Sequence, residues 1–259
     1  MRDHSVTDHA RPGLDWLVAR PIAHRGLHDA AAGVIENSLS AAEAAIAGGF
    51  GIECDVQLSA DGEAMVFHDF VLDRLTEQAG PVVARTAKEL AVIALKGSRD
   101  LVPTLAGFLD RIGGRVPLVI EIKSRFDGDL RLTRRAAEVV AARSGQPIVF
   151  KSFDPGIVAA LREIAPAIPR GVVGMNAYDY GDYERLDAAQ KHALANLLHY
   201  NESRPDFLSW KVAHLDSAVP FLCRNALGLP LMSWTVRTPQ DREKAARYAD
   251  QMVFEGFRP

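Results

Sequence analysis

Cysteine is almost absent from this chain of 259 residues, which contains only Cys54 and Cys223. The two residues stand in unrelated contexts without C-x-x-C spacing, so the sequence argues against a disulfide framework and against a cysteine-ligated metal site. A chain of this length buries about three quarters of its unfolded surface and needs neither device to hold a core. This cysteine usage fits a reducing compartment.

Long apolar runs and an excess of basic charge are also missing. No stretch approaches the roughly 18 apolar residues of a transmembrane helix, and the N-terminus lacks the apolar core of a signal peptide. The formal net charge is −3, which gives no basis for nucleic acid or an anionic membrane surface as a partner. We therefore expect a cytoplasmic protein with a small-molecule substrate; the sequence leaves its oligomeric state open.

Short apolar runs of strand length alternate with longer helical patterns, which is typical of βαβ units and a parallel sheet. The chain is 48% hydrophobic and 24% charged, an ordinary globular balance. Candidate strands lie at 21–24, 51–56, 64–68, 118–123, 147–152, 170–174, 206–211, 231–236 and 251–255. Helical patterns between them include 38–47, 104–112, 129–143, 155–164 and 240–248.

The second and third strands are too close together for a parallel crossover, which needs about a dozen residues. Asp61-Gly62 is a favoured turn pair, so we expect an antiparallel hairpin there. Setting 64–68 aside leaves eight strands, the number of a (β/α)8 barrel. The predicted fold class is α/β: a TIM barrel over 20–259 as a single catalytic domain, after an N-terminal extension over 1–19. The hairpin would be an outgrowth of strand two, with only a short cap.

The predicted turn also sets the pairing of the hairpin. With Asp61 and Gly62 as the two turn residues, Val66 would face Gln57 and His68 would face Asp55. Because side chains alternate along a strand, Glu53, Asp55 and His68 would then share one polar face. The opposite, apolar face would hold Val56, Leu58, Met65 and Phe67.

Polar residues stand where several core strands should end, at the rim where barrel enzymes carry out their chemistry. Three carboxylates, Glu53, Asp55 and Glu121, would repel one another at this rim without a cation. Oxygen ligands suit a hard divalent ion, Mg²⁺ or Ca²⁺. A salt-bridge network with Arg25 and Lys123 is the alternative. Later strand ends should also line the site, through Lys151, Ser152, Lys211 and Trp234.

Together these residues resemble the glycerophosphodiester phosphodiesterase family. A single tripeptide is a weak signal, but the ordered set runs through almost the whole chain. Its members are His24-Arg25-Gly26, Glu36-Asn37-Ser38, Glu53-Cys54-Asp55-Val56, His68-Asp69, Leu75-Thr76, Pro103-Thr104-Leu105, Glu121-Ile122-Lys123, Ser152-Phe153 and Trp234-Thr235-Val236.

The resemblance implies a barrel enzyme that uses a divalent metal to hydrolyse a glycerophosphodiester, or a lysophospholipid-type diester, to glycerol phosphate and an alcohol. It implies that Glu53, Asp55 and Glu121 hold the metal and that His24 and His68 form the acid/base pair. Arg25 and Lys123 would bind the phosphate. The further candidates for substrate binding are Glu36, Asn37, Ser152, Lys211, Trp234 and Glu255.

The chemistry of the residues agrees with this assignment. Hydrolysis of an anionic diester needs charge neutralisation, an activated nucleophile and a proton for the leaving group. Histidine has an unperturbed pKa near neutrality, and general acid–base catalysis contributes about 10²–10⁴-fold. We favour His24 as base and His68 as acid. The nucleophile is either water or a neighbouring glycerol hydroxyl, which would form a cyclic phosphate first.

Two features depart from the family's pattern. The last strand ends in Phe254-Glu255-Gly256, where the family commonly has an acidic residue after Thr or Ser and then Pro, so Glu255 would take the acidic role. Only 34 residues separate His68 from Pro103, too few for the insertion that members of the family often carry between these two motifs. We expect that segment to be a loop with a short helix at 86–95, and the mouth to be more open.

Two other functions are compatible with parts of this pattern. A phospholipid diester lyase would cyclise its substrate and stop at the cyclic phosphate. A non-catalytic barrel would bind phosphorylated ligands without turnover, but it predicts a gap in the set of carboxylates and histidines. None of these residues is missing.

Overall fold

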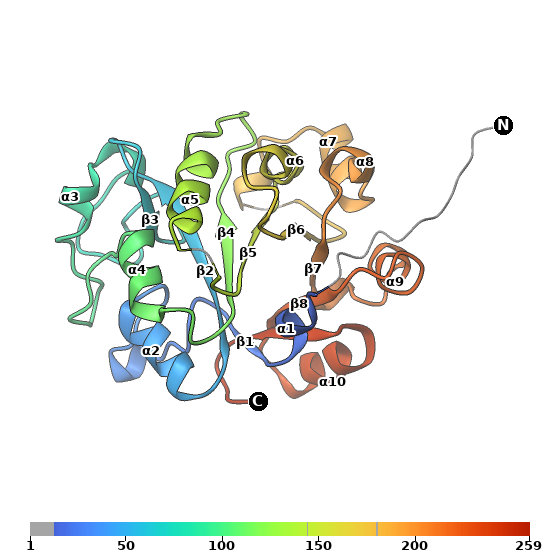
Figure 1. The fold of residues 1–259 in the computed structure, drawn as a ribbon, viewed down its shortest axis with the longest axis horizontal. Helices are drawn as coiled ribbons and strands as arrows, with labels where there is room; N and C mark the ends of the chain where they lie inside the picture. Colours follow the sequence, from blue (N-terminus) through green and yellow to red (C-terminus); the bar gives the residue numbers. More distant parts are fainter. Residues whose placement is uncertain (1–12, 144, 180) are drawn as a thin grey trace.

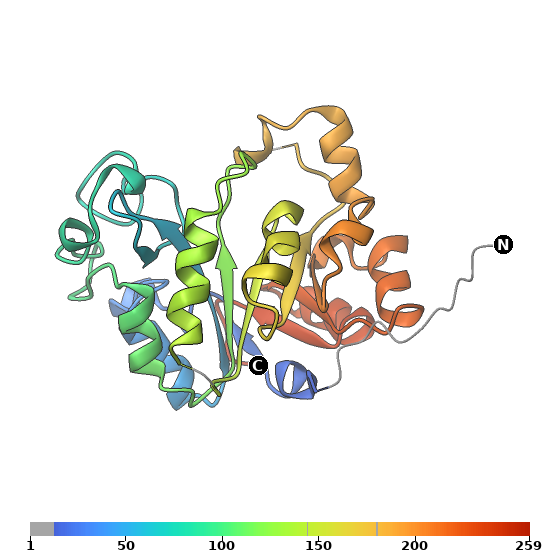
Figure 2. The ribbon, with the colours of Figure 1, turned by 45° about the horizontal axis from the view of Figure 1, so that its top comes forward.

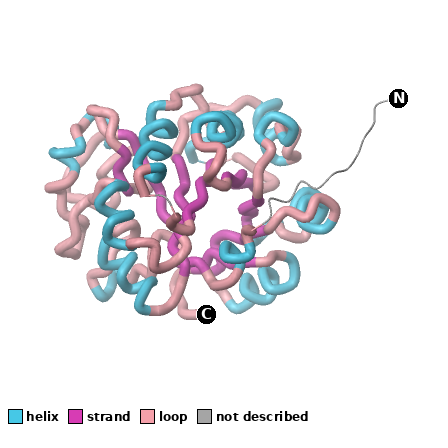
Figure 3. The backbone as a smooth tube through the Cα atoms, viewed as in Figure 1, coloured by secondary structure: helices cyan, strands magenta, loops and turns pink. Residues whose placement is uncertain are grey.

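The computed structural model describes residues 13–143, 145–179 and 181–259, and eight parallel strands of this part of the chain close into a barrel (Figures 1 and 3). Strand β1 pairs with both β2 and β9, which completes the ring. The α/β barrel prediction is therefore confirmed. The barrel strands are β1 (Ile22–Ala23), β2 (Gly51–Leu58), β4 (Leu118–Ile122), β5 (Ile148–Ser152), β6 (Arg170–Gly174), β7 (Phe207–Lys211), β8 (Leu231–Val236) and β9 (Gln251–Phe254).

Helices surround the ring of strands, as Figure 3 shows. Several begin at side-chain caps: Ser38, Thr104 and Asp154 each accept a hydrogen bond from a backbone N–H of the first turn. None of the helices that the structure describes combines the length and the apolar composition of a membrane-spanning segment. The helices are α1 (Asp15–Val18), α2 (Leu39–Ala47), α3 (Ala87–Leu90), α4 (Leu105–Ile112), α5 (Arg131–Ala141), α6 (Pro155–Ile164), α7 (Ala188–Ala195), α8 (Tyr200–Ser203), α9 (Ala218–Asn225) and α10 (Pro239–Tyr248).

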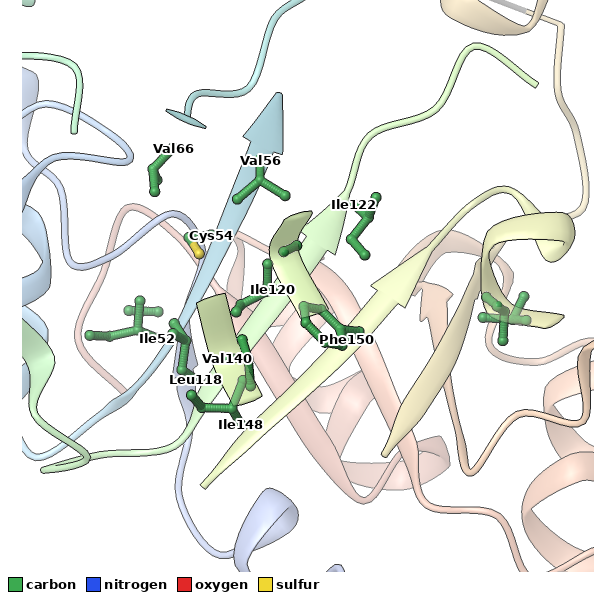
Figure 4. Packing of buried hydrophobic residues seen from close by; sticks show 14 of the residues in the cluster. Ile52, Cys54, Val56, Val66, Leu118, Ile120, Ile122, Val140, Ile148 and Phe150 are labelled. Carbon is green, nitrogen blue, oxygen red and sulfur yellow. The ribbon is translucent and has the colours of Figure 1, made fainter. Parts of the chain in front are cut away.

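Alternation along the strands separates the core from the site. One set of residues packs against the helices, including Ile52, Cys54 and Val56 of β2 and Ile120 of β4 (Figure 4). The other set points into the barrel, and near its N-terminal end this set is apolar. That inner layer consists of Ile22, Val119, Val149, Phe207, Met232 and Val253, joined by Leu17 of α1.

Helix α1 belongs to the extension predicted over 1–19, of which residues 1–12 lie outside the described part of the chain. Leu17 is fully buried in the inner apolar layer, and Trp16 packs beside it. This end of the barrel is therefore closed by side chains, which leaves polar chemistry to the opposite end.

The hairpin exists, but its predicted register was wrong by one residue. Strand β3 (Ala64–Val66) pairs antiparallel with β2, and Val66 lies opposite Val56 rather than Gln57. The loop has three residues instead of two, because the N–H of Ser59 donates to the carbonyl of Glu63. Gly62, the last loop residue, has φ +83°, the left-handed conformation that three-residue hairpins require.

The corrected register changes which residues share a face. Val66 and Ala64 pack with Val56 and Leu58, in the core between strands and helices. Met65 and Phe67 turn the other way, into a small separate core formed by the short cap after β3. This segment contains the 3₁₀ turn η2 (Val82–Ala84) and α3, and its core includes Leu72, Leu75, Val82, Leu90, Ile93 and Leu95.

A second segment reaches the C-terminal end of the barrel, between β6 and β7, and the sequence did not predict it. It contains η3 (Gly181–Tyr183), α7 and α8, and Figure 2 shows it extending beyond the strand ends. Tyr178 and Leu186 of this segment pack with Phe126, Phe153 and Trp234 from three neighbouring connections or strands. An aromatic wall therefore stands on this side of the mouth.

Candidate active site

The inward-pointing residues at the C-terminal ends of the strands are polar. In the sheet register, Asp55 of β2 lies beside Glu121 of β4, which lies beside Lys151 of β5. His24 directly follows β1, and its N–H donates to the carbonyl of Phe254 in β9. Because these strands are parallel, their ends bring the side chains to one rim.

Glu53, Asp55 and Glu121 meet as the sequence predicted. One carboxylate oxygen from each lies within 4.8 Å of the others, and all three residues are buried. Three oxygen donors in this arrangement form a candidate site for a hard divalent cation.

Two lysines neutralise part of this cluster. The Nζ of Lys151 lies 3.0 Å from both Glu53 and Glu121, and the Nζ of Lys123 lies 2.8 Å from Asp55 and 2.5 Å from Glu121. Burial works to raise the pKa of Glu121, but Lys123 and Lys151 hold it at about 2. The salt-bridge network raised as an alternative is thus present, and it keeps Glu121 ionised.

The charges of the cluster also fit a dication. Lys151 is almost fully buried, and its single charge offsets only one of the three carboxylate charges; Lys123 and Arg25 contribute to the rest. Lys123 lies nearer the mouth, on a flexible stem that can change partner. A bound cation would compete with this ammonium group for Asp55 and Glu121. The donor set therefore fits a divalent metal, with Lys123 as the group that must give way.

Arg25 lies in a tight loop beside the carboxylates. Its N–H donates to Glu53 (3.1 Å), and its guanidinium donates to Glu36 (2.6 Å) and lies 3.3 Å from Asp55. Arg25 has φ +57° and the next residue, Gly26, has φ +79°. A Cβ on Gly26 would approach the backbone of Ala41 to 2.8 Å, so the loop requires glycine here.

Asn37 also has positive φ, +60°, and it holds a predicted metal ligand. Its side-chain amide donates to Asp55 Oδ2 (3.0 Å), and its Oδ1 accepts from the N–H of Asp55 (3.1 Å). Both polar atoms of this side chain are used on one residue. Asn37 therefore orients the carboxylate of Asp55.

His24 is bound through one ring nitrogen. Its Nδ1 donates to Glu255 Oε2 (2.5 Å), since a carboxylate only accepts, while its Nε2 lies 3.9 Å from Glu53. Arg237 donates to both oxygens of Glu255, at 3.1 and 3.0 Å. Burial works to raise the pKa of Glu255, but His24 and Arg237 hold it far below its usual range.

His68 is bound in the same way, although β3 ends before it. Its Nδ1 donates to Asp69 Oδ1 (2.5 Å), and Arg74 donates to both oxygens of Asp69. In the corrected register a continued strand would turn His68 to the face of Val66. The strand instead stops at Val66, and the amide of Gln57 donates to the carbonyl of His68 (2.9 Å), which fixes the backbone where it turns.

The imidazole of His68 is near enough to the carboxylate cluster to act on the charge of Asp55. Burial works to raise the pKa of Asp55, but the charges of Lys123, His68 and Arg25 hold it well below its usual range. The two histidines follow β1 and β3, the strands that pair with β2, which carries Glu53 and Asp55.

The remaining predicted residues differ in position. Trp234 packs against the inner apolar layer and the aromatic wall, with its ring 5.3 Å from that of Phe153. Lys211 is half-buried and lies beside Trp234 in the register. Ser152 and Phe150 point to the same side of β5, toward the helices. The hydroxyl of Ser152 donates to the carbonyl of Ile122, so the structure places Ser152 outside the site.

Sequence reasoning missed four functional candidates or misjudged their task. Lys151 was expected only to line the site, although a lysine inside an apolar strand was a visible signal. Asp69 directly follows His68 in the sequence, and nothing in the local pattern indicates that it binds the imidazole. Arg74 and Arg237 lie in loops, and no local pattern indicates which carboxylates they bind.

Replacing Lys151 with methionine should destabilise the protein in metal-free buffer by about 3–5 kcal/mol, because Glu53 and Glu121 lose a buried counterion. Urea unfolding would measure the change. Lys244→Met is the matched control, since Lys244 binds Asp216 at the surface and should contribute about 0–1 kcal/mol. Equal losses in both variants would contradict the assigned role of Lys151.

Comparisons with known proteins point in one direction. The sequence profile of the glycerophosphoryl diester phosphodiesterase family matches residues 24–256. YhdW of Bacillus subtilis strain 168, provisionally named a glycerophosphodiester phosphodiesterase, is 27% identical over 246 residues, which cover 91% of this chain and 92% of YhdW.

Solved structures share the fold. An Oleispira antarctica phosphodiesterase, in complex with the product sn-glycerol-3-phosphate, is 21% identical with a TM-score of 0.73, covering 91% of this chain and 92% of its own. A glycerophosphodiester phosphodiesterase from Agrobacterium tumefaciens strain C58 is 25% identical with a TM-score of 0.67, covering 91% and 95%.

Proposed function

Because this chain belongs to the glycerophosphoryl diester phosphodiesterase family, we propose that it hydrolyses a glycerophosphodiester to glycerol phosphate and an alcohol by metal-dependent, two-histidine catalysis. The observation that carries the proposal is the carboxylate cluster flanked by two imidazoles, each bound through Nδ1. We propose further that the protein works in a reducing compartment, the cytoplasm, since both cysteines are free and buried.

The residues that would hold the metal are Glu53, Asp55 and Glu121. When bound, Mg²⁺ or Ca²⁺ supplies positive charge for the phosphoryl oxygens and Lewis-acid activation. The low pKa values of Asp55 and Glu121 support this role, because ligands that are already ionised need release no proton to bind a cation.

Arg25 and Lys123 bind the phosphate in this proposal. Both lie at the mouth side of the cluster and both contact Asp55. With Asp55 and Glu121 engaged in holding the metal, Lys123 would be free to bind a phosphoryl oxygen. The guanidinium of Arg25 remains oriented by Glu36 and presents its other N–H groups to the anion.

His24 and His68 transfer the protons. In each ring the Nδ1–H is committed to a carboxylate, which fixes the tautomer and leaves Nε2 for the reaction. His24, beside Glu53, takes the proton of the nucleophile, which is water or the neighbouring glycerol hydroxyl. His68 delivers a proton to the oxygen of the leaving alcohol.

The alcohol of the substrate would extend beside Lys123. Lys123 and Gln57 line a cavity of about 240 Å³ together with Phe70 of the cap and Arg125. The guanidinium of Arg125 lies 4.2 Å above the ring of Phe70, so the cap and the loop after β4 are joined there. This cavity offers both a polar and an aromatic surface to a head group.

The test is turnover of glycerophosphocholine before and after exhaustive treatment with EDTA, followed by ³¹P NMR of the products. We expect glycerol phosphate as the end product, activity reduced to background after chelation, and recovery when Mg²⁺ or Ca²⁺ is restored. Undiminished turnover after chelation would remove the metal from the proposal. A cyclic phosphate that accumulates and persists would instead identify a lyase.

A further inference from the structure

Each of the two imidazoles is the first member of the same three-part chain. His24 binds Glu255, which binds Arg237, and His68 binds Asp69, which binds Arg74. The first chain joins the two ends of the sequence, whereas the second lies within residues 68–74. Their atoms nevertheless connect identically.

In both chains, the carboxylate oxygen that accepts the imidazole Nδ1–H also accepts from the terminal NH2 of the arginine. For Asp69 this oxygen is Oδ1, and for Glu255 it is Oε2. The second oxygen accepts from the arginine Nε, at 2.7 Å in Asp69 and 3.1 Å in Glu255. A planar guanidinium that meets both oxygens fixes the plane of the carboxylate as well as its position.

We propose that Arg74 and Arg237 are positioning residues that act on the reaction through Asp69 and Glu255. Neither arginine contacts the carboxylate cluster. Each donates two hydrogen bonds to the carboxylate that orients an imidazole. Without these two bonds the carboxylate could rotate, and the imidazole ring would change its orientation with it. A misplacement of about 1 Å at a reacting group can lower a rate by 10²-fold.

Arg74 has a second connection that Arg237 lacks. It donates to both oxygens of Glu36, at 2.9 and 2.8 Å, and Glu36 in turn accepts from the guanidinium of Arg25. Burial works to raise the pKa of Glu36, but Arg74 and Arg25 hold it at about 2, so it stays ionised between them. Arg74 therefore helps to orient two residues: His68 through Asp69, and Arg25, which is proposed to bind the phosphate, through Glu36.

This difference separates the two arginines experimentally. The inference rests on the proposed function, so wild-type turnover of a glycerophosphodiester is measured first. Arg237→Ala should lower kcat by about 10–100-fold with KM unchanged. Arg74→Ala should lower kcat to a similar extent and also raise KM several-fold, because Arg25 loses the group that steadies Glu36.

A double-mutant cycle shows whether Arg74 acts through Asp69. If it does, the double variant should have a kcat no more than about twofold below that of Asp69→Asn alone. The losses of kcat caused by two residues that act as one unit do not multiply. Added guanidinium ion should raise the kcat of Arg74→Ala several-fold and leave that of Asp69→Asn unchanged.

Arg115→Ala is the matched control. Arg115 is as exposed as Arg74, 47% against 46%, and forms a two-point pair with Glu43 far from the rim. Its kcat should stay within about twofold of wild type. Thermal unfolding checks each variant, and Arg74→Lys, which keeps the charge but not the fork, replaces Arg74→Ala if that variant does not fold.

The outcomes are distinguishable. An inactive wild type would refute the proposed function. An active wild type in which Arg74→Ala and Arg237→Ala match Arg115→Ala would overturn this inference alone. Independent, multiplicative losses in the Arg74 and Asp69 cycle would also overturn it.

Discussion

Replacing His68 with alanine is expected to lower kcat on a glycerophosphodiester by about 10²–10⁴-fold, the range of general acid–base catalysis. The folded state should change little, since the imidazole is partly exposed and its ring contacts Asp69 in a loop after β3. Steady-state kinetics and thermal unfolding would measure the two effects. His192→Ala, on the exposed face of α7, is the control and should keep wild-type kinetics.

The leaving group tests the proton role of His68. An aryl diester such as a glycerophospho-p-nitrophenol releases an anion that needs no proton. His68→Ala should therefore lose much less activity on this substrate than on glycerophosphocholine. Equal losses on both substrates would contradict His68 as the acid, and a wild-type rate on both would remove it from the catalytic pair.

Replacing Glu121 with glutamine should remove most metal-supported turnover, by about 10²–10³-fold. The change deletes the carboxylate that lies between Lys123 and Lys151, while the amide oxygen can still accept from either ammonium group. Calorimetric titration with Mg²⁺ or Ca²⁺ should show at least a tenfold weaker affinity, with the circular dichroism spectrum unchanged.

The matched control is Glu43→Gln on α2. Glu43 is a charged surface residue bound to Arg111 and Arg115, so its replacement should alter neither affinity nor turnover. Unchanged metal affinity in Glu121→Gln would show that the cluster is a salt-bridge network without a metal function.

The sequence predicted the barrel well because strand alternation is a local property. Glu53 and Asp55 are separated by Cys54, and that spacing alone places both carboxylates on the inner face of β2. Parallel strands then bring Glu121 to the same rim, whatever the rest of the chain does.

The hairpin register could not be predicted in the same way. The pair Asp61-Gly62 suits a two-residue turn, but it also suits a three-residue loop that ends in a left-handed glycine. The choice depends on the Ser59–Glu63 pairing, a contact that the turn residues do not reveal. His68 reaches the site because β3 stops early, which is a property of the following cap.

The arginine chains lie beyond sequence reasoning for a different reason. Arg74 is separated from Glu36 by 38 positions, and Arg237 from Glu255 by 18. A long side chain on a loop can reach several carboxylates, so its partner is decided by tertiary packing. Lys151 differs, because it stands inside strand β5, where its burial was a visible signal, although the carboxylates that it binds were not.

The apolar floor of the barrel determines how molecules travel. Val119, Val149 and Phe207, with Leu17 beneath them, fill the interior of the barrel at its N-terminal end. Substrate and product therefore use the same opening, which lies between the cap and the aromatic wall. A product that stays bound at this opening blocks the next substrate molecule. Product release must therefore precede substrate binding.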